Sequence, residues 1–222
     1  MNAPNGKIQS PELIFKPLAT REEFDGYDEL LISTYLRERI FSKAFLPGSD
    51  VRRFGVVDEQ GRIAGICGLK DLDRDRTEFF LARIPVSVSS NIHIKEVINV
   101  VIRRPYHGSS AFAILCGGVA EAAVTFGADL LVGITRAPLL KSFVKFGLDP
   151  AVHEPLHLLG DEKINDFIIY YDFRAPGAVE YMRARTSRVI EQSRRMVVLR
   201  SQYLARSQDV NCTRTATVPL RN

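Results

Sequence analysis

The stretch from Lys95 to Leu148 places the strongest constraint on how this chain folds. It reads KEVINVVIRRPYHGSSAFAILCGGVAEAAVTFGADLLVGITRAPLLKSFVKFGL. A nearly continuous apolar run at 96–102 predicts a central strand covered on both faces. Small residues then precede an Ala-rich segment that predicts a helix over 110–126, and a strand at 129–135 and a helix at 137–146 follow. A helix that begins in a turn of small residues is typical of a site that holds an anionic group.

The composition is that of an ordinary soluble protein. Of the 222 residues, 45% are hydrophobic and 25% are charged, as in most globular domains. No apolar run approaches the roughly 20 residues that a membrane span needs, and the first residues lack the regions of a signal peptide. Cys67, Cys116 and Cys212 are far apart, which favours neither a disulfide framework nor a metal site. We therefore expect a cytoplasmic protein that holds no metal.

The charge of the chain is unevenly distributed. The net charge is +4, and the segment from Arg183 to the C-terminus carries nine arginines against Glu191 and Asp209. That segment therefore has a charge of +7, and the remainder of the chain is mildly acidic. A basic arm of this kind favours an acidic partner, and a solvated helix face followed by a tail is the alternative.

The residues before this stretch predict a strand, a helix and a hairpin. Thr20 and Glu23 have the spacing of a capping box, so a helix should begin there after a strand at 13–18. Residues 53–57 and 62–71 predict the two strands of a hairpin. The following residues are interpreted as a charged turn at 71–77 and then a short strand or a strand-to-helix transition at 78–84.

The residues after the stretch predict the last strands and a long helix. Candidate strands lie at 157–159 and 167–173, and an amphipathic helix is predicted from Ala178 to about Ala205. Within the Ala-rich helix, Gly117 and Gly118 cost roughly 2 kcal/mol of helix propensity. Their expected benefit is the close approach of another element.

This order of elements resembles the GCN5-related N-acetyltransferase (GNAT) family over residues 13–173. In that family a Gly-rich turn and the start of a helix hold the pyrophosphate of acyl-coenzyme A. Here the turn, 104–111, reads RPYHGSSA and keeps one of the family's glycines, Gly108. The segment 137–148 (APLLKSFVKFGL) matches the family's next helix, which has an aromatic residue before a lysine-x-glycine ending.

The resemblance implies the following organisation. The fold class is α+β: a GNAT-like mixed, mostly antiparallel central sheet flanked by helices, with a long C-terminal helix. The expected segments are a disordered N-terminus at 1–11, the acyltransferase domain at 12–174, a basic helix at 175–207 and a disordered tail at 208–222.

Departures from the usual family pattern point to a branch that uses long acyl chains. The N-acyl amino acid synthases and acyl-homoserine-lactone synthases have a Glu followed three residues later by an Arg in the central strand. This chain keeps the Glu, as Glu96, and has Asn99 in place of the Arg. Those relatives also carry an Arg shortly before an aromatic residue in the first helix, which Arg37 or Arg39 before Phe41 resembles. A turn with one glycine suits a phosphopantetheine arm that an acidic acyl-carrier protein delivers to the basic helix.

The resemblance also implies which residues are candidates for the site. Glu96 is the first candidate for the base that deprotonates the amine, and His93 is the rival, because histidine titrates nearest to neutral pH. The backbone N–H groups of Val100 and Val101 are candidate donors to the oxyanion. The remaining candidates are the catalytic residue Asn99, the thioester-binding residues Ile102, Arg104, His107, Gly108, Ser109, Ser110 and Ala111, and the substrate-binding residues Arg37, Phe41, Phe143 and Phe146.

Three functions follow from these observations. The first is an N-acyltransferase that moves a medium or long acyl chain from acyl-coenzyme A or acyl-phosphopantetheine to a small amine such as an amino acid. The second is an autoinducer-type acyl-homoserine-lactone synthase, against which the missing Arg counts. The third is a catalytically inactive module that binds a carrier protein or nucleic acid. Nucleic acid is disfavoured, because Tyr203 is the one aromatic residue of the basic arm.

Overall fold

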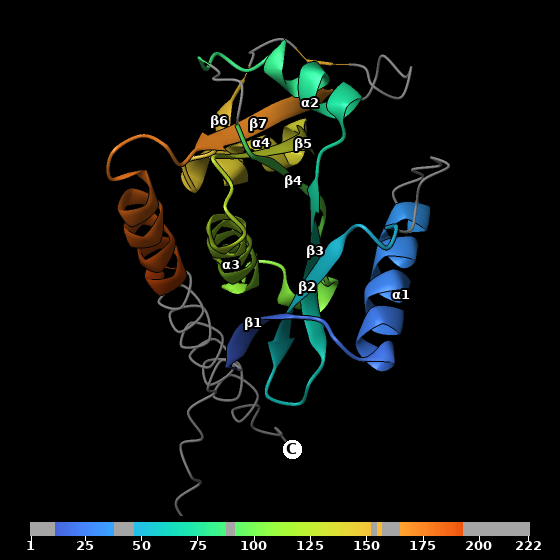
Figure 1. The fold of residues 1–222 in the computed structure, drawn as a ribbon. Helices are drawn as coiled ribbons and strands as arrows, with labels where there is room; N and C mark the ends of the chain where they lie inside the picture. The colour runs from blue at the N-terminus through green and yellow to red at the C-terminus, as the bar shows by residue number, and fades with distance from the viewer. Residues whose placement is uncertain (1–11, 38–46, 88–91, 152–154, 157–164, 193–222) are drawn as a thin grey trace, which may run out of the picture.

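A computed structural model describes residues 12–37, 47–87, 92–151, 155–156 and 165–192. These residues form a seven-stranded sheet with the order β1-β2-β3-β4-β5-β7-β6 (Figure 1). Neighbouring strands are antiparallel except β4 and β5, which are parallel. The strands are β1 Leu13–Pro17, β2 Arg52–Asp58, β3 Ile63–Asp71, β4 Ile94–Ile102, β5 Leu130–Arg136, β6 Asp149–Pro150 and β7 Asp166–Asp172.

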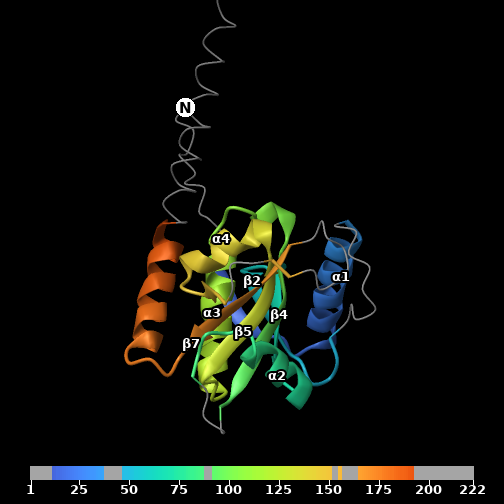
Figure 2. The same ribbon diagram turned by 90° about the horizontal axis from the view of Figure 1, so that it is seen from above.

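Helices cover both faces of the sheet. Figure 2 shows α1 on one face and α3 on the other, with the helix of residues 178–192 outside α3. None of the described helices is long and apolar enough to cross a membrane. The helical elements are α1 Arg21–Arg37, α2 Arg74–Leu81, the 3-10 turn η1 Arg104–Tyr106, α3 Ala111–Thr125 and α4 Ala137–Lys145. This α+β architecture confirms the expected fold class, and the long C-terminal helix is confirmed over residues 178–192.

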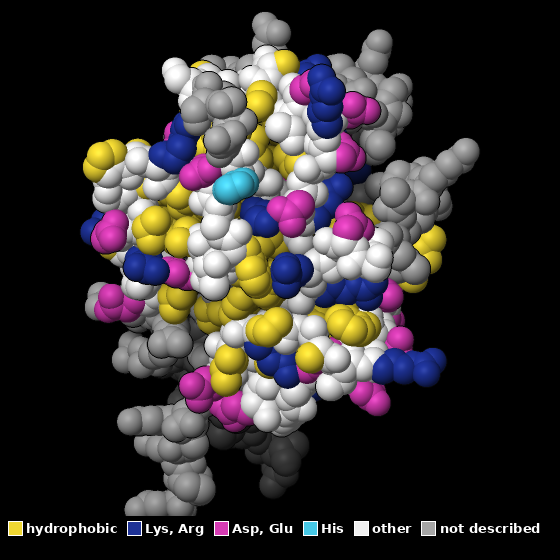
Figure 3. Space-filling model, in the orientation of Figure 1, with side chains coloured by type: hydrophobic (Ala, Val, Ile, Leu, Met, Phe, Trp, Pro, Cys, Tyr) yellow, Lys and Arg dark blue, Asp and Glu magenta, His cyan; other side chains and the backbone are white. Residues whose placement is uncertain are grey.

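Apolar side chains form a core on each face of the sheet. On the α3 side, Leu115 and Val119 pack with Val97, Leu131 and Ile169 of the sheet. Under α1, the buried side chains include Tyr27, Leu31 and Ile66. A third cluster joins Phe80 of α2 to β5 and β7. On the face drawn in Figure 3, hydrophobic side chains gather over the centre, with charged side chains scattered around them.

Local sequence signals account for most element boundaries. The capping box forms as expected: the Glu23 N–H donates to Thr20 Oγ1 at 3.3 Å, and Glu23 Oε2 accepts from the Thr20 N–H at 3.1 Å. The hairpin of β2 and β3 is also confirmed. The interpretation of 71–77 as a turn and 78–84 as a strand or transition is wrong, because α2 begins at Arg74 with Asp73 as its N-cap. The short β6 had no sequence signal, and the candidate strand at 157–159 lies outside the described residues.

The two glycines inside α3 are sites of close approach. A Cβ atom at Gly117 would lie 2.3 Å from Cγ2 of Thr186 in the helix of residues 178–192. A Cβ at Gly118 would lie 2.2 Å from the ring of Phe15 in β1. The expectation that these glycines admit another element is therefore confirmed, and two elements use them.

Candidate functional site

The central strands β4 and β5 separate halfway along their length. Their parallel pairing ends at Val97 opposite Gly133, although both strands continue beyond those residues. On the other edge of β4 the register with β3 shifts between Ile66 and Gly68, which marks a β-bulge. Asn99 lies in that bulge with a φ of 54°. The bulge re-aims the second half of β4 and opens the sheet.

A cavity of about 610 Å³ lies at this opening. Residues from both faces of the sheet line it, because the separated strands leave a passage between the α1 side and the α3 side. Its walls come from the end of α1, the second half of β4, the turn before α3, the end of β5 and α4. The lining residues include Thr34, Tyr35, Arg37, Asn99, Val100, Ile102, Tyr106, His107, Gly108, Ser109, Phe112, Arg136, Ser142, Phe143, Lys145, Phe146 and Asp166.

The turn before α3 uses several of its hydrogen-bonding groups internally. Ser109 Oγ donates to the Tyr106 carbonyl at 2.7 Å and accepts from the Ala111 N–H at 3.1 Å. Ser110 is the N-cap of α3 but makes no side-chain capping bond. His107 Nε2 lies 2.8 Å from the carbonyl oxygen of Ile102. A helix leaves its first N–H groups without intrahelical partners, so Phe112 and the residue after it still present donors at the cavity.

The turn before α3 leaves open space at Gly108. Gly108 has a φ of 77°, and a Cβ there would meet nothing within 4 Å. That position therefore leaves open space above the start of α3. Arg104 begins η1 and is exposed, and it is not among the cavity-lining residues.

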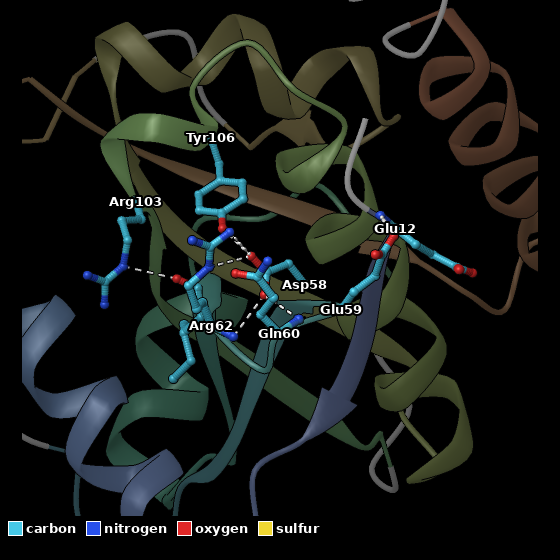
Figure 4. Close-up of polar contacts among 8 residues, drawn as sticks. Glu12, Asp58, Glu59, Gln60, Arg62, Arg103 and Tyr106 are labelled. Atoms are coloured by element: carbon cyan, nitrogen blue, oxygen red, sulfur yellow. Dashed lines mark hydrogen bonds and ion pairs between the residues drawn. The ribbon is translucent and has the colours of Figure 1, made fainter. Parts of the chain in front are cut away.

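A polar network fixes the turn to the β2–β3 hairpin (Figure 4). Asp58, at the end of β2, accepts hydrogen bonds from the Tyr106 hydroxyl at 2.6 Å and from Arg62 Nε at 2.8 Å. Arg103 donates through Nε to the Ile63 carbonyl at 3.0 Å. Gln60 and Arg62 also donate backbone N–H groups to Asp58. These bonds hold η1 in one position relative to the sheet.

The same network shifts two titration equilibria. The hydrogen bond from Tyr106, with those from Arg62 and Gln60, lowers the pKa of Asp58 to about 2 despite its burial. Burial and the bond to Asp58 raise the pKa of Tyr106. Asp58 therefore stays ionised and Tyr106 stays protonated through the neutral pH range.

Aromatic side chains form the α3–α4 wall of the cavity. Phe143 and Phe146 are each 4% exposed and both contact Phe112 edge-on, with ring centroids 5.3 and 5.6 Å apart. Such a wall favours an apolar ligand, because it offers area without hydrogen-bonding groups. The structure places both residues at the cavity. Their role in binding substrate stays a prediction.

The cavity lining is cationic overall. Arg37, Arg136 and Lys145 contribute positive charge, and Asp166 is the carboxylate among the lining residues. Within the described ranges, no group of three or more His, Cys, Asp or Glu side chains is placed to hold a metal ion. Phe41 and Arg39 lie outside the described residues.

The two candidate bases lie away from the cavity. Glu96 is 2% exposed and pairs with Arg76, with 3.2 Å between Oε2 and Nε, and with Lys70 at 3.4 Å. His93 stands at the start of β4 with its side chain 76% exposed, 4.0 Å from Asp129. Neither residue is among those lining the cavity. Their catalytic roles stay predictions, and the structure places the Glu96 carboxylate in ion pairs with two cations rather than at the cavity.

The direction of the backbone refines the oxyanion prediction. The Arg103 N–H donates to Ala64 of β3 at 2.8 Å. Successive N–H groups of a strand point to opposite edges, so Val101 also points toward β3. Val100 and Ile102 then point toward the opening between β4 and β5. This alternation favours Val100 and Ile102 over Val101 as donors to a group in the cavity.

Several cavity residues carried no signal that single-sequence reasoning could use. Thr34 and Tyr35 lie on α1, and Ser142 lies on α4, far from the turn in sequence. Tyr106 was part of the turn motif but was not a candidate. Helical spacing puts Tyr35 on the same face of α1 as Tyr27 and Leu31, and the position of β4 shows what that face meets.

No protein-family model and no curated protein matches this chain. Among solved structures, FeeM, an N-acyl amino acid synthase from uncultured soil microbes, is similar, with a TM-score of 0.61, 14% identity, and coverage of 79% of this chain and 95% of that chain. NAA60 of Arabidopsis thaliana in complex with acetyl-CoA has a TM-score of 0.54 and 13% identity, covering 73% of this chain and 100% of that chain. TofI in a ternary complex with an inhibitor and MTA has a TM-score of 0.50 and 13% identity, covering 76% and 96%. At these identities the likeness is one of fold.

Proposed function

We propose that this chain, which has the fold of the GCN5-related N-acetyltransferases, is an N-acyltransferase. It moves a medium or long acyl chain from a phosphopantetheine thioester to a small amine such as an amino acid. The observation that carries the proposal is the cavity that passes through the sheet where β4 leaves β5. A thioester carbon in that passage is reached by an arm from the α3 side and by an amine from the α1 side.

In the proposed reaction, the amine nitrogen forms a bond to the thioester carbon and loses a proton, while the carbon–sulfur bond breaks and the thiolate takes up a proton. Charge develops on the carbonyl oxygen, where backbone N–H donors are most effective. Val100 and Ile102 are the donors that we assign to this role, because strand alternation directs their N–H groups toward the opening.

The aromatic wall supports an acyl chain longer than acetyl. Phe112, Phe143 and Phe146 give the chain an apolar surface, and burial of each methylene contributes about 0.8 kcal/mol. An N-acyl amino acid synthase is among the similar structures, which favours the same class of product. The cationic lining favours an acceptor that carries a carboxylate.

The turn before α3 supports a donor with a single phosphate near the protein. Ser109 already occupies the Ala111 N–H that a pyrophosphate would otherwise bind. We propose that the donor is acyl-phosphopantetheine on an acidic carrier protein, with acyl-coenzyme A as the second candidate. The docking surface would be the basic segment after Arg183, although Arg183 itself pairs with Glu121 at 2.6 Å.

The proposed activity is tested by thiol release. The full chain is incubated with acyl-thioesters of increasing length and a panel of amino acids, and the acylated product is identified by mass spectrometry. Ser142→Trp is the control, because Ser142 is half-buried and lines the cavity from α4. Thiol release at the Ser142→Trp rate for every pair of substrates would contradict the proposal.

The donor is tested separately. Acyl-carrier protein and acyl-coenzyme A are compared as substrates at increasing salt, because docking of two charged surfaces weakens as salt screens them. We expect the rate with the carrier protein to fall with salt more steeply than the rate with coenzyme A. Equal salt dependence would remove the docking proposal and leave the acyltransfer intact.

A further inference from the structure

The α1 side of the cavity differs in chemistry from its aromatic wall. Tyr35 and Thr34 lie in the last turns of α1, and Asn99 faces them from the bulge of β4. The Tyr35 hydroxyl donates a hydrogen bond to Asn99 Oδ1 at 2.9 Å. These three side chains are polar and uncharged, and Arg37 adds a positive charge to the same end of the cavity, so this end offers hydrogen bonds and charge rather than apolar surface.

Asn99 makes this bond from an unusual backbone conformation. Among the described residues it is the only one other than glycine with a positive φ. The left-handed region costs most residues about 1–2 kcal/mol, and Asn tolerates it better than larger side chains do. The bulge thus needs a left-handed residue, and the bond to Tyr35 adds a requirement for a side-chain acceptor.

Thr34 adds an unsatisfied polar group at the same wall. It is 6% exposed, and its Oγ1 is buried with no hydrogen-bond partner in the described part of the chain. An unsatisfied buried hydroxyl costs about 1–3 kcal/mol. A polar ligand at this wall would remove that cost, so the hydroxyl points to a ligand with hydrogen-bonding groups.

We propose that Thr34, Tyr35 and Asn99 form the subsite for the acceptor amine. Asn99 orients the Tyr35 hydroxyl by accepting its proton in a hydrogen bond, and the phenol oxygen then accepts a hydrogen bond from the amine N–H. Thr34 provides the second hydrogen-bonding contact to the acceptor. Because Thr34, Tyr35 and Asn99 carry no negative charge and the positively charged Arg37 lines the same end of the cavity, the subsite favours the neutral amine, which is the form that reacts with a thioester. This inference rests on the proposed acyltransfer and assigns its two substrates to opposite walls.

Tyr35→Phe tests the inference, because it removes the hydroxyl and keeps the ring. Steady-state rates are measured with each substrate varied in turn. We expect the KM for the amine to rise tenfold or more, while the KM for the thioester stays within twofold. Tyr181→Phe is the matched control, because Tyr181 is 55% exposed on the C-terminal helix, away from the cavity.

Asn99→Gly separates the side chain from the backbone of the bulge. Glycine adopts a positive φ without strain, so this variant keeps the bulge and loses Oδ1. We expect the same selective rise in the amine KM, with a thermal midpoint at or above that of the wild type. A midpoint that is not lowered excludes misfolding as the cause of the defect.

The outcomes distinguish this inference from the function on which it rests. If the wild type acylates amines and both variants keep an amine KM within twofold of it, the subsite is wrong and the acyltransfer stands. If both variants raise the two KM values equally, the residues maintain the cavity and do not bind the acceptor. If the wild type releases no thiol with any pair of substrates, the proposed function and the subsite both fail.

Discussion

The Tyr106 hydroxyl lies 2.6 Å from Asp58 Oδ2, and this bond ties the turn before α3 to the end of β2. The two residues are 48 positions apart in sequence. Asp58 also accepts hydrogen bonds from the backbone N–H and the Nε of Arg62, four residues later in the chain. One carboxylate therefore contacts both the hairpin turn and η1. The ionised Asp58 side chain therefore helps to position the turn before α3, together with the bonds from Arg103 to β3.

Acid should weaken the protein through Asp58. The pKa of Asp58 is about 2 in the folded protein, and an Asp in an unfolded chain has a pKa of about 3.9. Between these values the unfolded state binds more protons, so stability rises with pH across the window from about 2 to 4 and is fully present above it. Denaturant unfolding at several pH values, with Asp58→Asn for comparison, measures this contribution.

Asp58→Asn should be less stable than the wild type at neutral pH and should lose part of the slope below pH 4. Asp28→Asn is a suitable control, because that carboxylate pairs with Arg53 on another part of the surface. Identical slopes in the wild type and Asp58→Asn would show that the carboxylate contributes nothing to acid stability.

Phe143 should set the length of the acyl chain. It lines the main cavity and also an apolar void of about 10 Å³ between α3 and the sheet, which Leu115, Cys116 and Leu131 help to enclose. Phe143→Leu joins the two spaces, so we expect the preference to shift toward longer thioesters. Rates over a series of chain lengths measure the shift.

Phe146→Leu is the matched control for that experiment. Phe146 is buried to the same extent and contacts the same ring of Phe112, but it does not line the void. We expect a smaller change in chain-length preference. Equal shifts in the two variants would show that the void plays no part.

Glu96→Gln should reduce stability. The substitution leaves Arg76 and Lys70 beside a buried amide, and we expect a loss of about 2 kcal/mol. The loss is smaller than for a fully buried pair because both cations are partly exposed. Thermal unfolding measures it, with Glu78→Gln as the control, since Glu78 forms an exposed pair with Arg74 and should change stability by less than about 0.5 kcal/mol. A variant with unchanged stability and no acyl transfer would restore Glu96 as the base.

Gly118→Ala should destabilise the protein although it raises helix propensity. In an open helix the change gains about 1 kcal/mol, but here a Cβ would lie 2.2 Å from the Phe15 ring. We expect a net loss of about 1–3 kcal/mol in the free energy of unfolding. The double variant with Phe15→Ala should lose less than the sum of the two single variants. Additive losses would mean that the ring does not cause the clash.

Local chemistry made much of the fold predictable. Thr20 and Glu23 carry their own capping bonds, and the apolar runs of β4 and β5 identify buried strands without knowledge of their neighbours. The error at 71–84 has the same local origin, because Asp73 is an N-cap that was interpreted as part of a turn. The branch resemblance drew attention to Glu96 and to Asn99, but could not show that one is ion-paired and the other faces the cavity.

The sequence by itself determined the strand-turn-helix order around 95–148, because periodicity, small residues and caps act over a few neighbouring positions. The tertiary structure decided the site. The bulge at Asn99, the opening beyond Val97 and the approach of Tyr35 each depend on how β4 pairs with strands and a helix that are distant in sequence. A hydrogen bond across 64 positions, such as that from Tyr35 to Asn99, leaves no local pattern, since it forms only when packing brings both elements together.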